Sequence, residues 1–101
     1  METQSVSSSR PTQARLTSLA VSKDQKRLLV VELKRGRASD VVVGQVLRYM
    51  GYVQDVLTTS GQTVSGVIIA LEDDQRLKRA LSVVPSVAFY RYEVGFKLSK
   101  V

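Results

Sequence analysis

The chain has 101 residues, of which 44% are hydrophobic and 24% charged, and this composition is typical of one small globular domain. It contains neither cysteine nor histidine, which excludes disulfides, thiolate or imidazole metal sites and any catalytic triad built on histidine. The formal net charge of +6 favours an anionic partner such as nucleic acid. No segment reads as a membrane span or a signal peptide, so we expect a cytoplasmic protein.

The first half of the chain predicts an arm, a hairpin and a long helix. Residues 1–13 are rich in Ser, Thr and Gln and predict a flexible arm, while residues 14–101 predict the folded domain. Strands are predicted over 14–22 and 28–34, with a turn over 23–26 and a basic loop over 35–39. Ser39 or Asp40 can then cap a helix that ends near residues 60–61. Its apolar positions follow the 3.6-residue period and are Val42, Val43, Val46, Met50, Val53 and Leu57.

The second half predicts a strand, a short helix and a last strand. Residues 64–71 have the length and β-branched content of a buried strand, and Asp73 and Asp74 open a helix that runs to about residue 83. The last strand is predicted because apolar and polar side chains alternate from residue 90 to residue 98. The expected fold is an α/β mixed sheet with the order β-β-α-β-α-β and at least one antiparallel hairpin.

One acid and one lysine on the second predicted strand form a candidate catalytic pair. Glu32 and Lys34 are two residues apart and therefore project from the same face of the strand. The Glu32 carboxylate and the Leu33 carbonyl are oxygen ligands suited to Mg²⁺, and Lys34 can orient water or balance charge in phosphodiester cleavage. The alternative interpretation is that Glu32 and Lys34 are ordinary charged residues on an exposed strand, with no catalytic role.

Polar side chains on the predicted helix can face that pair. Gln45 and Tyr49 are four residues apart and so lie on one face of the helix, as do Arg48 and Tyr52, which can touch phosphate or stack on a base. Tyrosines at the edge of a core helix explain this spacing equally well.

Basic residues gather around the predicted hairpin. A phosphate backbone that followed this hairpin would pass Glu32 and Lys34. A solvated loop that only improves solubility is the alternative. The candidate nucleic-acid contacts, with one from the helix, are Lys23, Lys26, Arg27, Arg35, Arg37 and Arg48.

Four blocks of this sequence together resemble the PD-(D/E)xK nucleases. The blocks are LLVVELKRGRASD at 28–40, VGQVLRYMGYV at 43–53, GVIIA at 66–70 and FYRYEVGFKL at 89–98. They are similar to the endonuclease branch that acts on branched, mismatched or single-stranded DNA. The resemblance implies a restriction-endonuclease-like fold, DNA as a partner and Mg²⁺ as a cofactor.

The resemblance also implies roles for individual residues. Glu32 matches the metal-binding carboxylate, Lys34 the catalytic lysine, and Gln45 with Tyr49 the Q-x-x-x-Y pair of such enzymes. The family has a further aspartate on the preceding strand, where this chain has Thr17.

The hairpin itself predicts where Thr17 lies. A turn centred on Asp24 and Gln25 pairs Thr17 with Glu32 across the two strands. Since a hydroxyl is a neutral and weak ligand, this substitution weakens the expected Mg²⁺ site. The chain also lacks the N-terminal helix of the family, which would leave an apolar surface open, and we therefore expect a homodimer.

Two functions remain open from the sequence. The chain is either a DNA-binding protein of nuclease fold, with Mg²⁺-dependent cleavage retained or lost through its altered site, or an inactive module for protein interaction and assembly.

Overall fold

The computed structural model describes residues 2–7 and 15–101. The described strands form one five-stranded sheet with the order β1-β2-β3-β4-β5. β1 to β3 run antiparallel to their neighbours, whereas β3, β4 and β5 run parallel. The elements are β1 (Glu2–Ser7), β2 (Arg15–Val21), β3 (Arg27–Arg37), α1 (Asp40–Tyr52), the π-helical turn η1 (Val53–Leu57), β4 (Thr63–Glu72), α2 (Gln75–Leu81) and β5 (Val87–Arg91).

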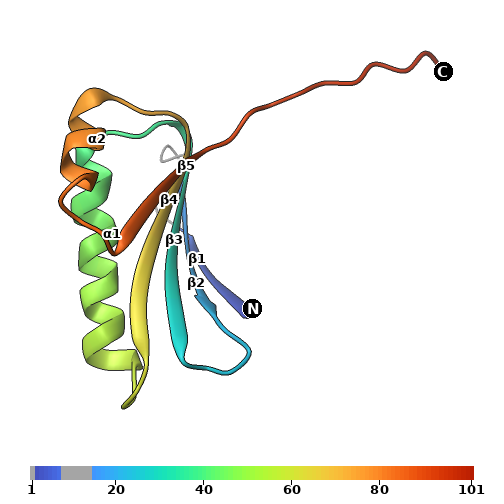
Figure 1. Ribbon diagram of the computed structural model, residues 1–101. Helices are drawn as coiled ribbons and strands as arrows, with labels where there is room; N and C mark the ends of the chain where they lie inside the picture. Colours follow the sequence, from blue (N-terminus) through green and yellow to red (C-terminus); the bar gives the residue numbers. More distant parts are fainter. Residues whose placement is uncertain (1, 8–14) are drawn as a thin grey trace.

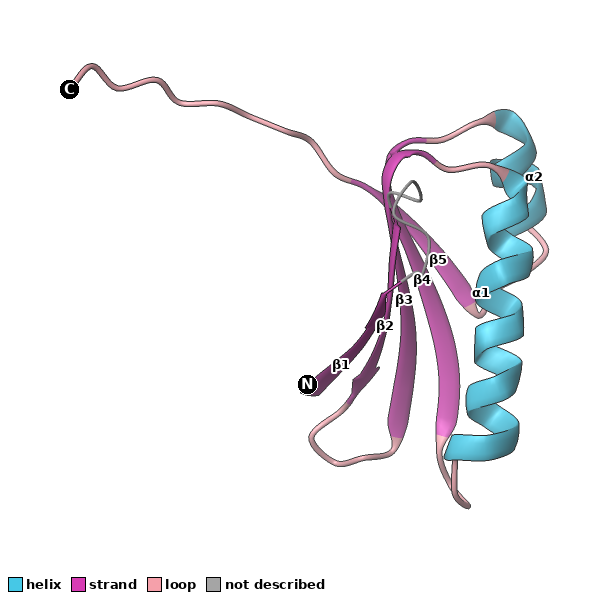
Figure 2. Ribbon diagram, turned by 180° about the vertical axis from the view of Figure 1, so that it is seen from behind, coloured by secondary structure: helices cyan, strands magenta, loops and turns pink. Residues whose placement is uncertain are grey.

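Both helices cover the same face of the sheet (Figures 1 and 2). The connections β3–α1–β4 and β4–α2–β5 step across the sheet in one direction. Because parallel crossovers are almost always right-handed, two steps in the same direction put both helices on one side. The predicted order β-β-α-β-α-β is thus confirmed for β2 to β5 with α1 and α2.

The core lies between this helical layer and the sheet. α1 buries Val42, Val43, Val46 and Met50, as its periodicity predicts. Opposite them lie Leu28 and Val30 of β3, Ile68 of β4 and Val87 of β5, and Leu77 of α2 belongs to the same cluster. The helix-facing side of β3 is therefore fixed by Leu28 and Val30, and Glu32 follows on the same side.

The helix ends differ in detail from the prediction. Ser39 is the N-cap of α1 but makes no side-chain capping hydrogen bond, and Asp40 lies in the first turn. After Tyr52 the helix widens into η1, where Thr58 N–H donates to Val53 O, and Leu57 is 49% exposed instead of buried. A π-turn advances by more residues per turn than an α-helix, so it rotates Leu57 away from the apolar stripe. α2 begins as predicted, since the Asp74 carboxylate caps it by accepting from Leu77 N–H.

Three further predictions need correction. Part of the expected arm is a strand, because residues 2–7 pair with β2 through the backbone; residues 1 and 8–14 lie outside the described residues. The expected loop over 35–39 is largely strand, because β3 continues to Arg37 past an irregularity. The last strand ends at Arg91, since the pairing with β4 ends there and the chain leaves the sheet (Figure 1).

The other face of the sheet carries no helix from the described part of the chain (Figure 2). It presents the alternate residues of the central strands, and Leu33, Leu71 and Tyr90 are exposed there. The expected open apolar surface is therefore present in part, since Ser18, Ala20 and Val67 on the same face are buried. In addition, no helix within the described residues is both long and apolar enough to cross a membrane.

Gly66 of β4 lies where α1 packs most closely on the sheet. A Cβ atom at this position would lie 2.8 Å from both Val46 Cγ1 and Met50 Sδ. We expect Gly66→Ala to lower the free energy of unfolding by about 1–3 kcal/mol, because Val46 is a stiff side chain that cannot move aside. Gly44→Ala, on the exposed side of α1 with nothing within 4 Å, should raise it by about 0.5–1 kcal/mol. Urea unfolding measures both, and equal stability of the two variants would contradict this packing.

Candidate functional site

Glu32 lies in the interior on the helix-facing side of β3. Its side chain is 0% exposed, and its neighbour on β4 is the equally buried Ile68. Thr17 of β2 is its cross-strand partner, and the Thr17 hydroxyl donates to Glu32 Oε2 at 2.7 Å. The register predicted from the turn is therefore confirmed, and the neutral hydroxyl occupies the side of the carboxylate that faces β2.

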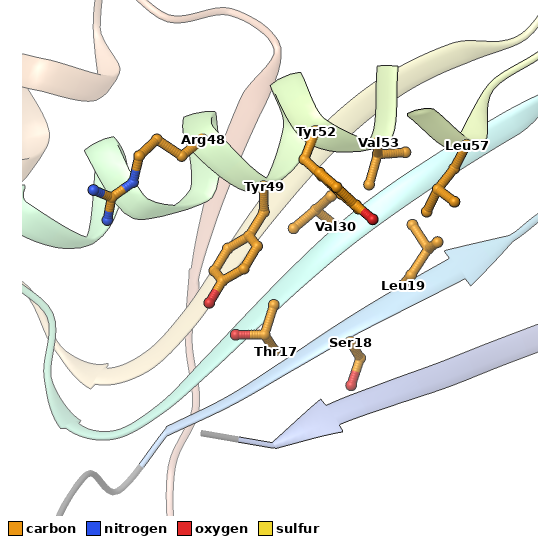
Figure 3. Close-up of a pocket in the computed structure, with 9 residues that line it drawn as sticks. All are labelled: Thr17, Ser18, Leu19, Val30, Arg48, Tyr49, Tyr52, Val53 and Leu57. Carbon is orange, nitrogen blue, oxygen red and sulfur yellow. The ribbon is translucent and has the colours of Figure 1, made fainter. Parts of the chain in front are cut away.

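The three other predicted catalytic residues come from two elements around Glu32. Lys34 follows on the same face of β3 and is half-buried. Gln45 and Tyr49 lie one turn apart on α1, where Gln45 is half-buried and Tyr49 is exposed at its edge. Tyr49 reaches from α1 towards the sheet beside Thr17 (Figure 3). The four residues thus come from β3 and α1, two elements that pack against each other, and their catalytic roles stay predictions.

A groove of about 730 Å³ opens beside Glu32, between α1 and β2 (Figure 3). Tyr49, Tyr52 and Arg48 contribute the larger side chains from α1, and Thr17 lies on the opposite wall. No pattern in the sequence predicts this groove as a whole. The remaining lining residues are Ser18, Leu19, Val30, Val53 and Leu57. The sequence hints at this groove in one way. Thr17 and Leu19 alternate along one face of β2, while α1 packs over β3 and β4.

The donor set around Glu32 is weaker than the resemblance implies for a Mg²⁺ site. Within residues 2–7 and 15–101 there is no group of three or more acidic, His or Cys side chains able to hold a metal. Leu33, the other expected ligand, keeps strand partners on both sides, in β2 and in β4. Protein Mg²⁺ sites combine one or two carboxylates with waters and substrate phosphates. Glu32 offers a single carboxylate that solvent does not reach.

The hydrogen bond from Thr17 should support the stability of the fold. Thr17→Val keeps the shape of the side chain but removes the donor from a buried carboxylate, and we expect it to lower the free energy of unfolding by about 1–3 kcal/mol. Thr17→Ser keeps the hydroxyl and should lose less. Chemical unfolding of the two variants measures the difference. Thr17→Val as stable as Thr17→Ser would show that the bond contributes nothing.

The basic residues form two clusters instead of one surface. Lys23, Lys26 and Arg27 are exposed at the turn between β2 and β3, which we call the hairpin cluster. Arg35 and Arg37 are exposed at the opposite end of β3, which we call the exit cluster. The two ends of β3 are about 33 Å apart at roughly 3.3 Å per residue. The long extension of β3 separates residues that are neighbours in the sequence, and Glu32 lies between the two clusters.

The sequence matches no protein-family model, and a search of curated proteins finds no significant match. Solved structures do match. EndoMS in its apo form is 26% identical over 81% of this chain and 34% of its own, with a TM-score of 0.64. A repair endonuclease from Pyrococcus abyssi is 23% identical over 92% of this chain and 39% of its own, with a TM-score of 0.63. A complex of EndoMS with dsDNA gives 22% identity over 94% of this chain and 38% of its own, with a TM-score of 0.64.

The chain has a nuclease fold. The resemblance to PD-(D/E)xK nucleases that the sequence indicated is confirmed at this level. The chain spans between a third and two fifths of the length of these nucleases.

Proposed function

We propose that this chain binds DNA through its nuclease fold and does not cleave it. The observation that carries the proposal is the contact between Thr17 and Glu32. A nuclease of the resembled type uses two acids at these positions to hold a metal beside the phosphodiester. Here a hydroxyl replaces one acid, and the other is 0% exposed and bonded to that hydroxyl. A buried single carboxylate cannot meet a hydrated metal and a phosphate without rearrangement of β2 or α1, so Mg²⁺ is left out of the proposed function.

The distribution of positive charge supports DNA as the partner. The hairpin cluster and the exit cluster are separated by about the length of one turn of B-DNA, which is roughly 34 Å. A duplex lying along β3 would therefore meet both clusters with equivalent phosphates. Arg48, at the rim of the groove, offers one more cation, and Tyr52 offers an aromatic ring for an unstacked base. One of the similar structures is itself a complex of EndoMS with dsDNA.

A homodimer is part of the proposal, because an apolar sheet face that carries no helix in the described part of the chain is a surface that a second copy can cover. The same exposed apolar surface favours the second candidate function, an assembly module that contacts protein alone. The cytoplasm stays a prediction from the sequence.

Retention of the chain on immobilised DNA over a series of salt concentrations separates the two functions. If about six phosphates are contacted, the affinity should fall by roughly a thousandfold between 50 mM and 200 mM salt. An absence of retention at the lowest salt would reject DNA binding and leave the assembly role. Retention that does not change with salt would also contradict the proposal, because contacts to phosphates release counterions.

A further inference from the structure

The C-terminal segment, residues 92–101, is extended and lies apart from the rest of the fold (Figure 1). It starts at Tyr92, whose N–H donates to Ala70 O and whose hydroxyl donates to Arg35 O. Beyond it, Phe96 is 91% and Leu98 is 97% exposed, and Val94 is exposed as well. These apolar residues alternate with Glu93, Gly95 and Lys97, which is the pattern of a strand with one apolar face.

The segment continues a strand whose outer edge has no neighbour among the described strands, because β5 is the last strand of the sheet. Ser86 O and Tyr92 N–H both point towards β4, so the even-numbered residues of β5 direct their backbone groups inward. The odd-numbered residues, which alternate with them, then direct their N–H and C=O groups to the open edge. If the segment keeps the course of β5, Glu93, Gly95 and Lys97 present a row of free backbone donors and acceptors.

We propose that the C-terminal segments of two copies pair as antiparallel strands about a two-fold axis at Gly95. This register places Glu93 opposite Lys97 of the second copy, and the reverse, so each dimer gains two cross-strand pairs of opposite charge. These pairs are of the hydrogen-bonded type, because both members direct their backbone groups to the open edge. The apolar residues occupy the non-hydrogen-bonded pairs, where side chains lie closer together.

The apolar pairs fit the same register. Val94 faces Phe96 of the second copy, and Tyr92 faces Leu98. An axis shifted to Val94 would put Arg91 opposite Lys97, two like charges. An axis shifted to Phe96 would put Glu93 opposite Ser99 and Lys97 opposite Gly95, so both pairs of opposite charge would be lost. Gly95 is thus the position about which the segment is complementary to itself in both charge and hydrophobicity.

The consequence is a single interface that runs from one sheet to the other. The segment of one copy extends past the axis and lies beside β5 of the second copy, so it adds a strand to that edge. A two-stranded ribbon alone is marginal in water, but here each strand is anchored at the edge of a five-stranded sheet. The inference rests on the proposed homodimer but places its contact at the edge of β5 and in the C-terminal segment, not on the open sheet face, and it does not depend on DNA binding.

Cross-linking in the full chain tests the register directly, because the native sequence has no cysteine. Two Gly95→Cys residues facing each other at the axis would have Cα atoms about 5.5 Å apart, within the range of a disulfide. Ser99→Cys is the matched control in the same segment, since its two copies would lie more than about 20 Å apart. Under mild oxidation we expect Gly95→Cys to form covalent dimers and Ser99→Cys to remain uncross-linked. Equal cross-linking of both variants would overturn the register.

Charge reversal tests the same pairing without oxidation. Glu93→Lys and Lys97→Glu should each weaken the dimer by about tenfold in analytical ultracentrifugation, because each puts two like-charged pairs into the interface. The double variant Glu93→Lys/Lys97→Glu should regain the native affinity. A native chain that stays monomeric would overturn both this inference and the homodimer. A stable dimer without rescue by the double variant would overturn only this inference and assign the dimer to another face.

Discussion

Replacing Thr17 by aspartate is expected to give the chain a divalent metal site with two carboxylates. The Thr17 hydroxyl lies 2.7 Å from Glu32 Oε2, so an aspartate carboxylate there would face the Glu32 carboxylate at close range. Two carboxylates in a buried site repel each other, and without metal the variant should be less stable than the native chain at neutral pH. A bound cation would reverse this effect. A metal concentration of about 100 times the dissociation constant adds about 2.7 kcal/mol to the free energy of unfolding. For a domain of this size, that corresponds to a rise in Tm of roughly 10 °C or more.

Thermal unfolding with Mn²⁺, with Mg²⁺ and with chelator measures this change. Thr17→Asn is the neutral control of similar shape, and Thr17→Asp/Glu32→Gln is the control that removes the second acid. Only the single Thr17→Asp variant should be stabilised by metal. If this variant alone also gains DNA cleavage, a single missing ligand accounts for the difference between the native site and an active one. An equal metal-dependent rise in the native chain would show that Thr17 does not limit metal binding.

Neutralising either basic cluster is expected to weaken DNA binding strongly and to the same extent for every DNA sequence. The triple variant Lys23→Gln/Lys26→Gln/Arg27→Gln should lose roughly two orders of magnitude in affinity at 0.1 M salt, and its salt slope should fall by about one for each phosphate contact removed. The double variant Arg35→Gln/Arg37→Gln should lose somewhat less. All five side chains are exposed, so their removal should leave the fold intact.

The control for this experiment carries the same change in charge on another part of the molecule. Arg76→Gln/Arg79→Gln removes two exposed charges from α2, which belongs to neither cluster. Fluorescence anisotropy with a labelled duplex gives the affinities and the salt slopes. If the α2 variant lost as much affinity as the exit-cluster variant, binding would depend on net charge alone and the two clusters would have no special role.

The pairing of Thr17 with Glu32 could be predicted because it depends on local rules. A short turn fixes the register of a hairpin, and the apolar alternation along β3 fixes which side faces the core. The apolar face of α1 and the apolar segment of β4 were likewise predictable. The first repeats over several helical turns, and the second is a continuous apolar run of strand length.

The features that were missed depend on neighbours that the sequence does not identify. Strand β1 is held by backbone pairing to β2, and its side chains carry no strong strand pattern. The segment after Arg91 has a clear strand pattern but no partner within the described sheet, so the predicted strand is longer than β5. The two basic clusters looked like one because β3 continues into residues that read as a loop.

Incubation of the native chain with labelled duplex DNA and Mn²⁺ or Mg²⁺, with bound and cleaved DNA measured in the same samples, tests the central claim most directly. We predict that the chain retains the duplex at low salt and leaves every phosphodiester intact, with the same result in chelator. Metal-dependent cleavage by the native chain that Glu32→Ala abolishes would contradict the account, because it would mean that one buried carboxylate beside a threonine is sufficient for catalysis.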